Sequence, residues 1–377
     1  MNAWLPRGRG QWLALGLGVL ALVACLLLGL MVSAKQTMLS YLFAFVFFCG
    51  LSVGSLALLM VHALTGGAWG HHLRPALLST ARVLPLMALL AVPILVCMRV
   101  LYAWPHADVL AHDTLLRKQS WYLNPTFFVI RTVLYFAVWG LLLALFTRRL
   151  SRHRSLPCVA APGLILFAIS SLLAGTDWTV SLLPHWSSST YGMMFATGWI
   201  LAAMAWVTLV AMWRPDSADA HPPPLRHDYG NLLLVLVLGW SYLAFMQYLT
   251  IWVADMPTEN VWYIPRTLTS WAWLGRFLIT FHFAIPFAIL LSRKAKRSRA
   301  WMGAVAAMLL MANLGDALWL VVPNFRADGF MLRWSDLAAV VGIGALWCCA
   351  WLGQWRVARA LPADASPSTS TWTHSHG

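Results

Sequence analysis

The sequence predicts an all-α, polytopic membrane protein with ten transmembrane helices. Of its 377 residues, 60% are hydrophobic and only 10% are charged, whereas about a quarter of the residues in a soluble domain are charged. The chain also contains repeated apolar runs of about 20 residues, the length that a helix needs to cross the hydrocarbon core. These runs are continuous, without the period of two that is typical of a membrane β-barrel.

Short loops rich in proline, glycine and polar residues separate the apolar segments. The first segment follows Arg7 and Arg9 like the start of a signal peptide, but it is long and has no A-x-A site before Lys35, so we expect a retained helix. Residues 1–360 are predicted to form one integral membrane domain, and 361–377 a disordered cytoplasmic tail. The ten segments are 11–34, 40–64, 80–104, 126–147, 160–183, 190–213, 229–254, 268–292, 300–322 and 334–357.

Lysine and arginine are distributed unequally between the two sets of loops. Loops on the side of the N-terminus hold 17 of the 26 basic residues, and the opposite loops hold six. The positive-inside rule therefore predicts that both termini are cytoplasmic. This topology accounts for the net charge of +14, so no nucleic-acid partner is expected. The 17 are Arg7, Arg9, Arg74, Arg82, Arg148, Arg149, Arg152, Arg154, Arg214, Arg226, Arg293, Lys294, Lys296, Arg297, Arg299, Arg356 and Arg359, and the six are Lys35, Arg117, Lys118, Arg266, Arg326 and Arg333.

The cysteines and histidines give little support for a bound metal. Six cysteines are present without a CxxC or CxxCH pattern, so no zinc ribbon, covalent haem or iron–sulfur cluster is predicted. A b-type haem would need two facing histidines at one depth, whereas His62 is expected near the cytoplasmic end of its helix and His282 nearer to mid-membrane. We expect no metal site.

Five charged residues lie inside apolar segments and more than two residues from either end: Arg99, Arg131, Asp177, Arg276 and Asp316. With the topology above, all five lie in the outer part of the bilayer. Because a charge in a membrane is costly and usually marks a partner or a pathway, we expect a shared polar cluster. The alternative is that each side chain reaches independently to the headgroups.

Asp177 begins a polar stretch at the outer end of an apolar segment. Ser181 follows at a spacing of i, i+4 and shares its helix face, Pro184 is predicted to end the helix, and His185 falls in the outer loop. An acid that is partly desolvated in lipid can take up or release a proton near neutral pH. Asp177 and His185 are therefore candidates for a proton exit path, although His185 is equally a candidate for an ordinary loop residue.

A second polar string is expected on the cytoplasmic side. His227 and Asp228 open the seventh segment, with Asp228 predicted to cap the helix. His62 and His282 lie in the second and eighth segments. Such groups could relay protons, but they could equally make hydrogen bonds between helices.

Several stretches together resemble one family of membrane proteins. They are LMVHALTGGAWG (59–70), LPLMALLAVPILV (84–96), YLNPTFFVIRTVLYF (122–136), DWTVSLLPHWSSSTYG (177–192), HDYGNLLLVLVLGWSYLAFMQYLTIW (227–252), WYIPR (262–266), FHFAIPFAILLSR (281–293) and ALWLVVPNF (317–325). In these stretches the chain is similar to the polysulfide-reductase (NrfD-like) membrane subunits. It most closely resembles the ActF-type subunit of alternative complex III, a bacterial respiratory quinol:cytochrome c oxidoreductase.

The resemblance implies a fold and a function. Helices two to five and six to nine would form two four-helix bundles, with two peripheral helices. The subunit would contribute to proton translocation or to the surroundings of a quinone site, with no redox cofactor of its own and quinone or quinol as the candidate ligand. Its partners would be a sister NrfD-like quinol-binding subunit, an outer-face iron–sulfur subunit, haem c subunits and membrane lipids. It would lie in a bacterial inner membrane, and it would not be an autonomous enzyme.

The sequence departs from the family pattern before the Pro-His-Trp motif. A glutamate is common there in the family, and this chain has Leu183. Leu183 cannot carry a proton. If protons leave by this route, Asp177 and His185 must therefore carry them instead. A secondary transporter and a purely structural membrane anchor remain the alternatives, because both accommodate ten helices with buried charges.

Overall fold

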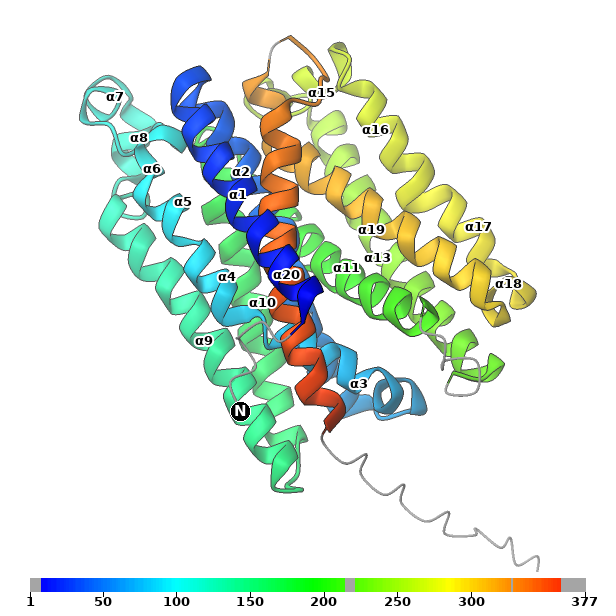
Figure 1. The fold of residues 1–377 in the computed structure, drawn as a ribbon. Coiled ribbons are helices and arrows are strands. Elements are labelled where there is room, and N and C mark those ends of the chain that lie inside the picture. Colours follow the sequence, from blue (N-terminus) through cyan, green and yellow to red (C-terminus); the bar gives the residue numbers. More distant parts are fainter. Residues whose placement is uncertain (1–7, 214–220, 327, 361–377) are drawn as a thin grey trace, which may run out of the picture.

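The computed structural model describes residues 8–213, 221–326 and 328–360, and the regular elements in these ranges are all helical (Figure 1). The predicted tail 361–377 lies outside the described residues. The helices are α1 (Arg9–Val32), α2 (Ala34–Thr65), α3 (Ala68–Ala81), α4 (Leu84–Leu90), α5 (Val92–Val96), α6 (Met98–Leu101), α7 (Ala107–His112), α8 (Thr114–Gln119), α9 (Pro125–Ser151), α10 (Pro157–Trp178), η1 (Val180–Leu182), α11 (Tyr191–Trp213), α13 (Pro223–Ala254), α14 (Pro257–Asn260), α15 (Ile264–Leu268), α16 (Ala272–Leu278), the π-helix η2 (Ile279–Ala284), α17 (Ile285–Leu291), α18 (Arg293–Arg297), α19 (Arg299–Val321), η3 (Pro323–Phe325) and α20 (Trp334–Ala360).

The all-α membrane architecture predicted from composition is confirmed. Within the described residues, nine helical stretches are long and apolar enough to cross a bilayer, and α1 adds a further apolar helix of 24 residues. The third segment differs from the prediction of 80–104, because its helix already starts at Ala68. It then breaks into α4, α5 and α6, with Pro85 and Pro93 each in the first turn of a new piece, where a proline lacks no hydrogen bond that the helix needs.

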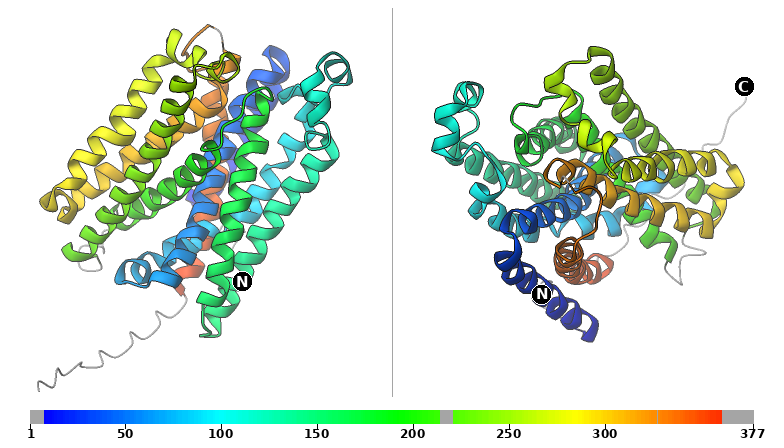
Figure 2. Two further views of the ribbon diagram at one scale, coloured as in Figure 1. Left: turned by 180° about the vertical axis from the view of Figure 1, so that it is seen from behind. Right: turned by 90° about the horizontal axis from the view of Figure 1, so that it is seen from above.

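The long helices form two groups that meet along α2 and α11 (Figures 1 and 2). The first group contains α2, the broken helix α3–α6, α9 and α10. The second contains α11, α13, the helix α16–η2–α17, and α19. Helices α1 and α20 pack against each other beside α2, outside both groups. This is the arrangement of two four-helix bundles and two peripheral helices that the resemblance implied.

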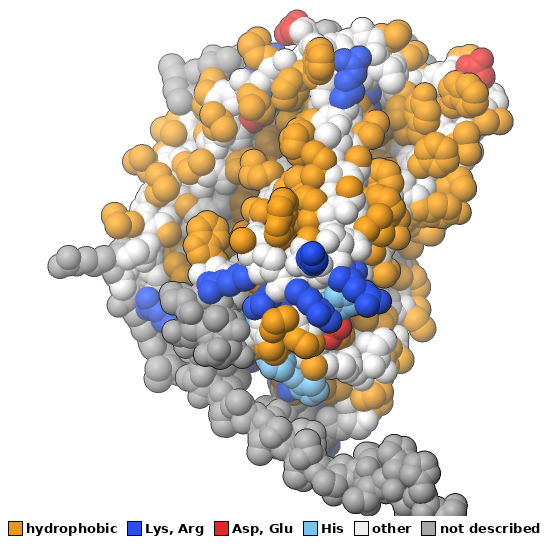
Figure 3. Space-filling model, turned by 90° about the vertical axis from the view of Figure 1, so that its right-hand side faces the viewer, with side chains coloured by type: hydrophobic (Ala, Val, Ile, Leu, Met, Phe, Trp, Pro, Cys, Tyr) orange, Lys and Arg blue, Asp and Glu red, His pale blue; other side chains and the backbone are white. Residues whose placement is uncertain are grey.

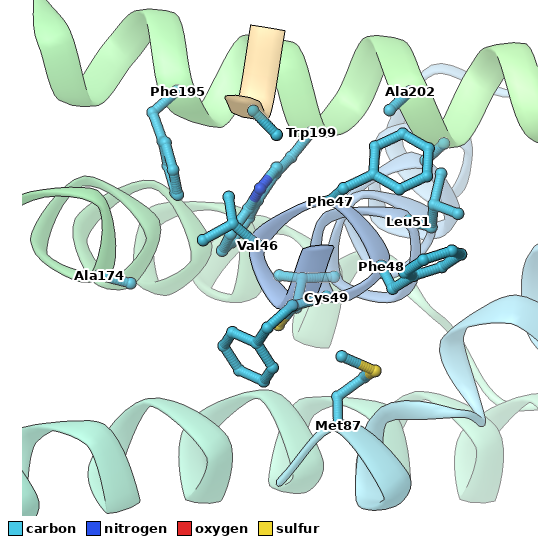
Figure 4. Close-up of a cluster of buried hydrophobic side chains, with 14 of the residues drawn as sticks. Val46, Phe47, Phe48, Cys49, Leu51, Met87, Ala174, Phe195, Trp199 and Ala202 are labelled. Carbon is cyan, nitrogen blue, oxygen red and sulfur yellow. The ribbon is translucent and has the colours of Figure 1, made fainter. Parts of the chain in front are cut away.

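Glycines on α2 allow the two bundles to approach closely. A Cβ added at Gly50 would lie 2.2 Å from the Trp199 ring, and one at Gly54 would lie 2.2 Å from the Trp199 carbonyl oxygen. Trp199 of α11 thereby packs directly onto α2, next to Val46 and Cys49 in the buried cluster of Figure 4. The close contact between the bundles therefore requires glycine at these two positions of α2, because any larger residue would clash with Trp199.

Two predicted helix ends are wrong by one to two turns. We expected α10 to continue to Pro184, but the α-helix ends at Trp178 and the short 3-10 turn η1 follows. We expected Asp228 to cap α13, but α13 begins at Pro223, and Asp228 is an exposed residue inside it. The prolines at 222–224 explain the earlier start, because a proline at the first helical position lacks only an N–H that would have no helical partner.

Candidate functional site

Asp177 is held in an ion pair with Arg131. The guanidinium donates from Nε to Oδ2 at 2.7 Å and from Nη2 to Oδ1 at 2.9 Å, and the Tyr135 hydroxyl donates to Oδ2 at 2.6 Å. The side chains of Arg131 and Asp177 are 6% and 0% exposed. Ser181 donates to the main-chain carbonyl of Asp177 and not to its carboxylate. Both carboxylate oxygens therefore accept hydrogen bonds, from the guanidinium and from the Tyr135 hydroxyl.

Aromatic side chains fix the position of Arg131. Its guanidinium carbon lies 3.8 Å from the centre of the Tyr122 ring and 4.4 Å from that of Phe127, and Nη1 donates to the Tyr122 carbonyl at 2.9 Å. Burial, followed by the charge of Asp177, raises the pKa of the Tyr122 phenol to about 12. A neutral phenol thus lies against the cation. The ion pair links the first turns of α9 to the last turn of α10, at the end of the molecule that the charge distribution predicts to face outward and that we call the outer end.

The predicted cluster of five intramembrane charges is not formed. Only Arg131 and Asp177 meet. Arg99 and Arg276 are exposed, and Arg276 lies with its guanidinium carbon 4.5 Å from the centre of the Trp273 ring. Asp316 makes no ion pair with any residue that the structure describes. Long arginine side chains can reach the interface from the lipid-facing side of a helix, and the sequence pattern did not reveal which face each one occupies.

Asp316 lies in the second bundle at the position that corresponds to Asp177. Each acid is on the last helix of its bundle, seven residues before a proline, Pro184 or Pro323, and each helix is followed by a 3-10 turn. Arg276 likewise precedes the basic residue Arg293 by 17 residues, as Arg131 precedes Arg148. The second bundle therefore repeats the charge pattern of the first without forming its ion pair.

The surroundings of Asp316 are apolar and aromatic. Its side chain is 6% exposed and lies beside the indole of Trp240. Both groups face Gly198 of α11, since a Cβ added there would be in ordinary van der Waals contact with them, 3.8 Å from Asp316 Oδ2 and 3.8 Å from Trp240 Nε1. The acid and the indole thus share one buried space between α11, α13 and α19.

A small cavity opens beside this acid. It has a volume of about 20 Å³, and Asp316 and Asn313 line it together with Phe47, Phe195 and Trp199. A single water needs about 10–15 Å³ measured in this way, and ligand pockets have several hundred. The cavity therefore fits one water next to the carboxyl, and it does not fit a quinone ring.

His282 adds an ionisable group on the other side of Trp240. The centres of the two rings are 3.9 Å apart, the imidazole is fully buried, and both of its nitrogens lack a hydrogen-bond partner among the described residues. It lies in the π-helix η2, four residues before Pro286, which has no N–H to donate to the His282 carbonyl. Short π-helical turns inside α-helices are frequent at functional sites.

Gln247 extends this polar group toward the outer end of the bundle. It lies seven residues after Trp240 on α13, and therefore two turns further along the same face. Its side chain is buried beside Tyr263, and neither amide atom has a hydrogen bond within the described part of the chain. We call Asp316, Asn313, Trp240, His282 and Gln247 the Asp316 group.

His185, which the sequence groups with Asp177 as a candidate for an exit path, contacts Asp113 instead. Its Nε2 lies 2.7 Å from Oδ2 of Asp113, which also accepts from the amides of Leu115 and Leu116 at the start of α8. The bond from the Leu116 amide and the contact with His185 lower the pKa of Asp113. His185 is exposed, so this pair joins two outer loops and is not part of the buried site.

The remaining candidates lie toward the basic end of the molecule. His62 packs edge-on against Trp69 and His71, and its Nε2 is 3.1 Å from the Gly67 carbonyl. Nδ1 of His227 lies 3.3 Å from Nδ2 of Asn231, and the next residue in the chain is the exposed Asp228. The neighbours of His62 differ from those of His282, so the two do not form a pair of haem ligands.

Two buried arginines were assigned to outer loops by the sequence. Arg266 is 1% exposed, stacks on Trp262 at 3.5 Å, and donates to the carbonyls of Trp262 and Trp319 and to Asn324. Arg326 forms an ion pair of 2.7 Å with Asp336 of α20, and both are buried. An acid at the start of an apolar segment, Asp336 in the first turn of α20, could have indicated from the sequence that Arg326 has a buried partner.

Leu183, which replaces the expected glutamate, lines a narrow outer cleft of about 10 Å³ with Trp186, Trp262 and Asn324. Trp186 stacks on Trp262 with ring centres 5.2 Å apart and donates from Nε1 to the Glu259 carbonyl. The Pro-His-Trp and WYIPR stretches therefore meet here, and together they join the outer ends of the two bundles.

No family model matches the chain, and a comparison with curated proteins finds no relative. The function must therefore be inferred from the residues and their arrangement.

Proposed function

We propose that the protein is a membrane subunit of a respiratory quinol-oxidising complex and that its own contribution is proton transfer through the Asp316 group. In this proposal the electrons are handled by partner subunits, namely a sister quinol-binding membrane subunit, an iron–sulfur subunit and haem c subunits. The similarity of the sequence to ActF-type subunits supports this assignment.

The main support for this proposal is the environment of Asp316. Its buried carboxyl makes no ion pair with a described residue, and it lines a cavity large enough for one water. An ionised carboxylate in apolar surroundings is unstable unless a cation or several donors accompany it. Asp316 therefore gains stability by binding a proton, and the adjacent cavity gives that proton a carrier. Asp177 lacks this property, because Arg131 already neutralises it.

Further polar side chains lie on both sides of Asp316 along the second bundle. Gln247 lies toward the outer end, and His282 lies across Trp240 toward the middle of the membrane. Further toward the basic end, the buried hydroxyls of Ser55 and Thr208 have no hydrogen-bond partner in the described ranges. Polar groups without fixed partners can accept a transient water or proton, unlike groups already committed to helix–helix bonds.

Reconstitution of the purified complex in liposomes tests the proposal, with quinol oxidation and proton release measured separately. Asp316→Asn keeps the shape of the side chain and removes its ability to carry a proton. We expect normal assembly and a lower ratio of protons released to electrons transferred. Asp108→Asn, which changes an exposed acid on α7, is the matched control and should leave the ratio unchanged.

The proposal fails if the Asp316→Asn complex releases as many protons per electron as the wild type. The assignment to a complex is tested by purification from native membranes, where iron–sulfur and haem c subunits should accompany the protein. A stable solitary species that moves a solute would favour the transporter alternative.

A further inference from the structure

A dense group of basic side chains covers one end of the second bundle. Five bases occur within the seven residues 293–299, on α18 and at the start of α19, and Arg226 and His227 of α13 lie beside them. Figure 3 views this side of the molecule and shows blue and pale blue side chains gathered below an apolar surface. The five are Arg293, Lys294, Lys296, Arg297 and Arg299.

Several contacts hold these bases in fixed positions. Lys296 donates from Nζ to the Asn231 side chain at 2.7 Å, and Arg226 donates from Nε to the Arg297 carbonyl at 2.7 Å. Gly230 allows the close approach, since a Cβ added there would lie 2.5 Å from Cγ of Lys296. The helix α18 is thus held on α13 by these contacts, while Arg293, Lys294 and Arg297 are exposed.

No acid in the described part of the chain forms an ion pair with the exposed bases of this group. Arg293, Lys294 and Arg297 are exposed and make no ion pair with any described residue, and Asp228 is the acid next to His227. Burial, together with the nearby Arg293, lowers the pKa of Lys296. A bound anion would relieve this repulsion.

The surface next to the bases is suited to acyl chains. Leu291, Val235, Leu238 and Trp301 are 58%, 65%, 41% and 54% exposed, and they lie on the bundle helices that lead away from the basic group. A ligand that fits both surfaces has an anionic head and an apolar tail. Phosphate oxygens accept charge-assisted hydrogen bonds from arginine and lysine, and basic pockets at membrane-helix ends bind anionic lipid headgroups.

We propose that Arg293, Lys294 and Arg297, held on α13 by Lys296, form a binding site for the phosphate of an anionic phospholipid. The site lies at the basic end of the second bundle, in the leaflet that the charge distribution predicts to be cytoplasmic. It is independent of proton transfer through Asp316.

The test compares two triple variants of the full-length protein. Arg293→Gln, Lys294→Gln and Arg297→Gln remove the exposed bases of the site and leave Lys296 in place. Arg148→Gln, Arg152→Gln and Arg154→Gln remove the same charge from exposed positions at the end of α9 and in the loop after it. Retained lipid is counted by native mass spectrometry, and the thermal shift is measured on adding phosphatidylglycerol, phosphatidylcholine or inorganic phosphate.

Each basic side chain near an anionic surface strengthens binding about fivefold, so the site variant should bind phosphatidylglycerol about a hundredfold more weakly than the wild type. The Arg148 control should differ much less, and phosphatidylcholine and inorganic phosphate should produce no shift. Equal losses in the two variants would show a general attraction to the basic face and overturn the proposal. Retention of an acidic protein in place of lipid would also overturn it.

Discussion

At the residue scale, the partner of a buried acid decides what the acid can do. Asp177 and Asp316 occupy corresponding positions in the two bundles, but only Asp177 has an arginine and a tyrosine hydroxyl on its carboxylate. Asp316 has an indole, a glycine and a small cavity. The first acid therefore contributes to structure, and the second is the better candidate for a proton carrier.

Removal of Arg131 should destabilise the protein strongly. Arg131→Met leaves Asp177 buried without its cation, and breaking a buried pair in this way typically costs about 3–5 kcal/mol. The double variant Arg131→Met, Asp177→Leu should recover most of that loss, because both charges are then replaced by apolar groups. Thermal unfolding of the detergent-purified protein measures both effects.

Arg276→Met is the control for this experiment. Arg276 is exposed and stacks on Trp273, so its replacement should change the free energy of unfolding by no more than about 0.5 kcal/mol. Equal losses for Arg131→Met and Arg276→Met would contradict the structural role of the ion pair.

His282 should show opposite effects on stability and function. Both of its buried nitrogens lack partners among the residues described, and a buried unsatisfied polar group costs about 1–3 kcal/mol. His282→Leu should therefore raise the midpoint of thermal unfolding while it lowers the ratio of protons to electrons in the reconstituted complex. A drop in the unfolding midpoint would show that the imidazole has a stabilising partner.

At the element scale, the apolar runs predicted where helices form but not where they start and end. The run that begins at 40 belongs to a helix that starts at Ala34, with Ser33 accepting from the Gln36 amide. The polar Lys35 and Gln36 hid this turn, since periodicity is only visible among apolar residues. A proline in the sequence likewise does not show whether a helix starts or ends there. Pro223 begins a helix, whereas Pro184 lies beyond the end of one.

The contact between α2 and α11 should not tolerate a side chain at Gly54. An alanine there would place its Cβ 2.2 Å from the main-chain oxygen of Trp199, which cannot move without α11. We expect Gly54→Ala to destabilise the protein by about 1–3 kcal/mol, the usual range for overpacking. Thermal unfolding again gives the measurement.

Gly140→Ala is a matched control in α9, where an added Cβ meets nothing within 4 Å. Alanine favours a helix over glycine by up to about 1 kcal/mol, so this variant should be neutral or more stable. If both alanines have the same effect, close packing of the bundles at Gly54 is refuted.

At the scale of the whole molecule, the unequal distribution of lysine and arginine between the two ends predicts the orientation of the protein in the membrane. Cys158 is exposed at the basic end, in the first turn of α10, and Ser120 lies near the opposite end, before α9. In variants that retain one cysteine, a membrane-impermeant maleimide should label Cys158 from the cytoplasmic side only. Ser120→Cys should be labelled from the outside only. The reverse pattern would overturn the predicted topology.

The sequence by itself determined the all-α membrane fold, the ten helical segments and the grouping of bases at one end. These properties are carried by runs of neighbouring residues, and burial in lipid acts on each run separately. It also identified Asp177, Asp316 and His282 as unusual, because a polar side chain in an apolar run is visible without a structure.

Only the tertiary structure decided which of these groups are satisfied. Whether Arg131 or Arg276 meets an acid depends on how each helix is rotated and on what the neighbouring helix presents, and neither is encoded in one segment. The sequence ranked Asp177 first, and packing gave that acid a cation while it left Asp316 beside Gly198 and a space for one water. The partners come from residues far apart in the chain, and contacts of that kind form only when the bundle assembles.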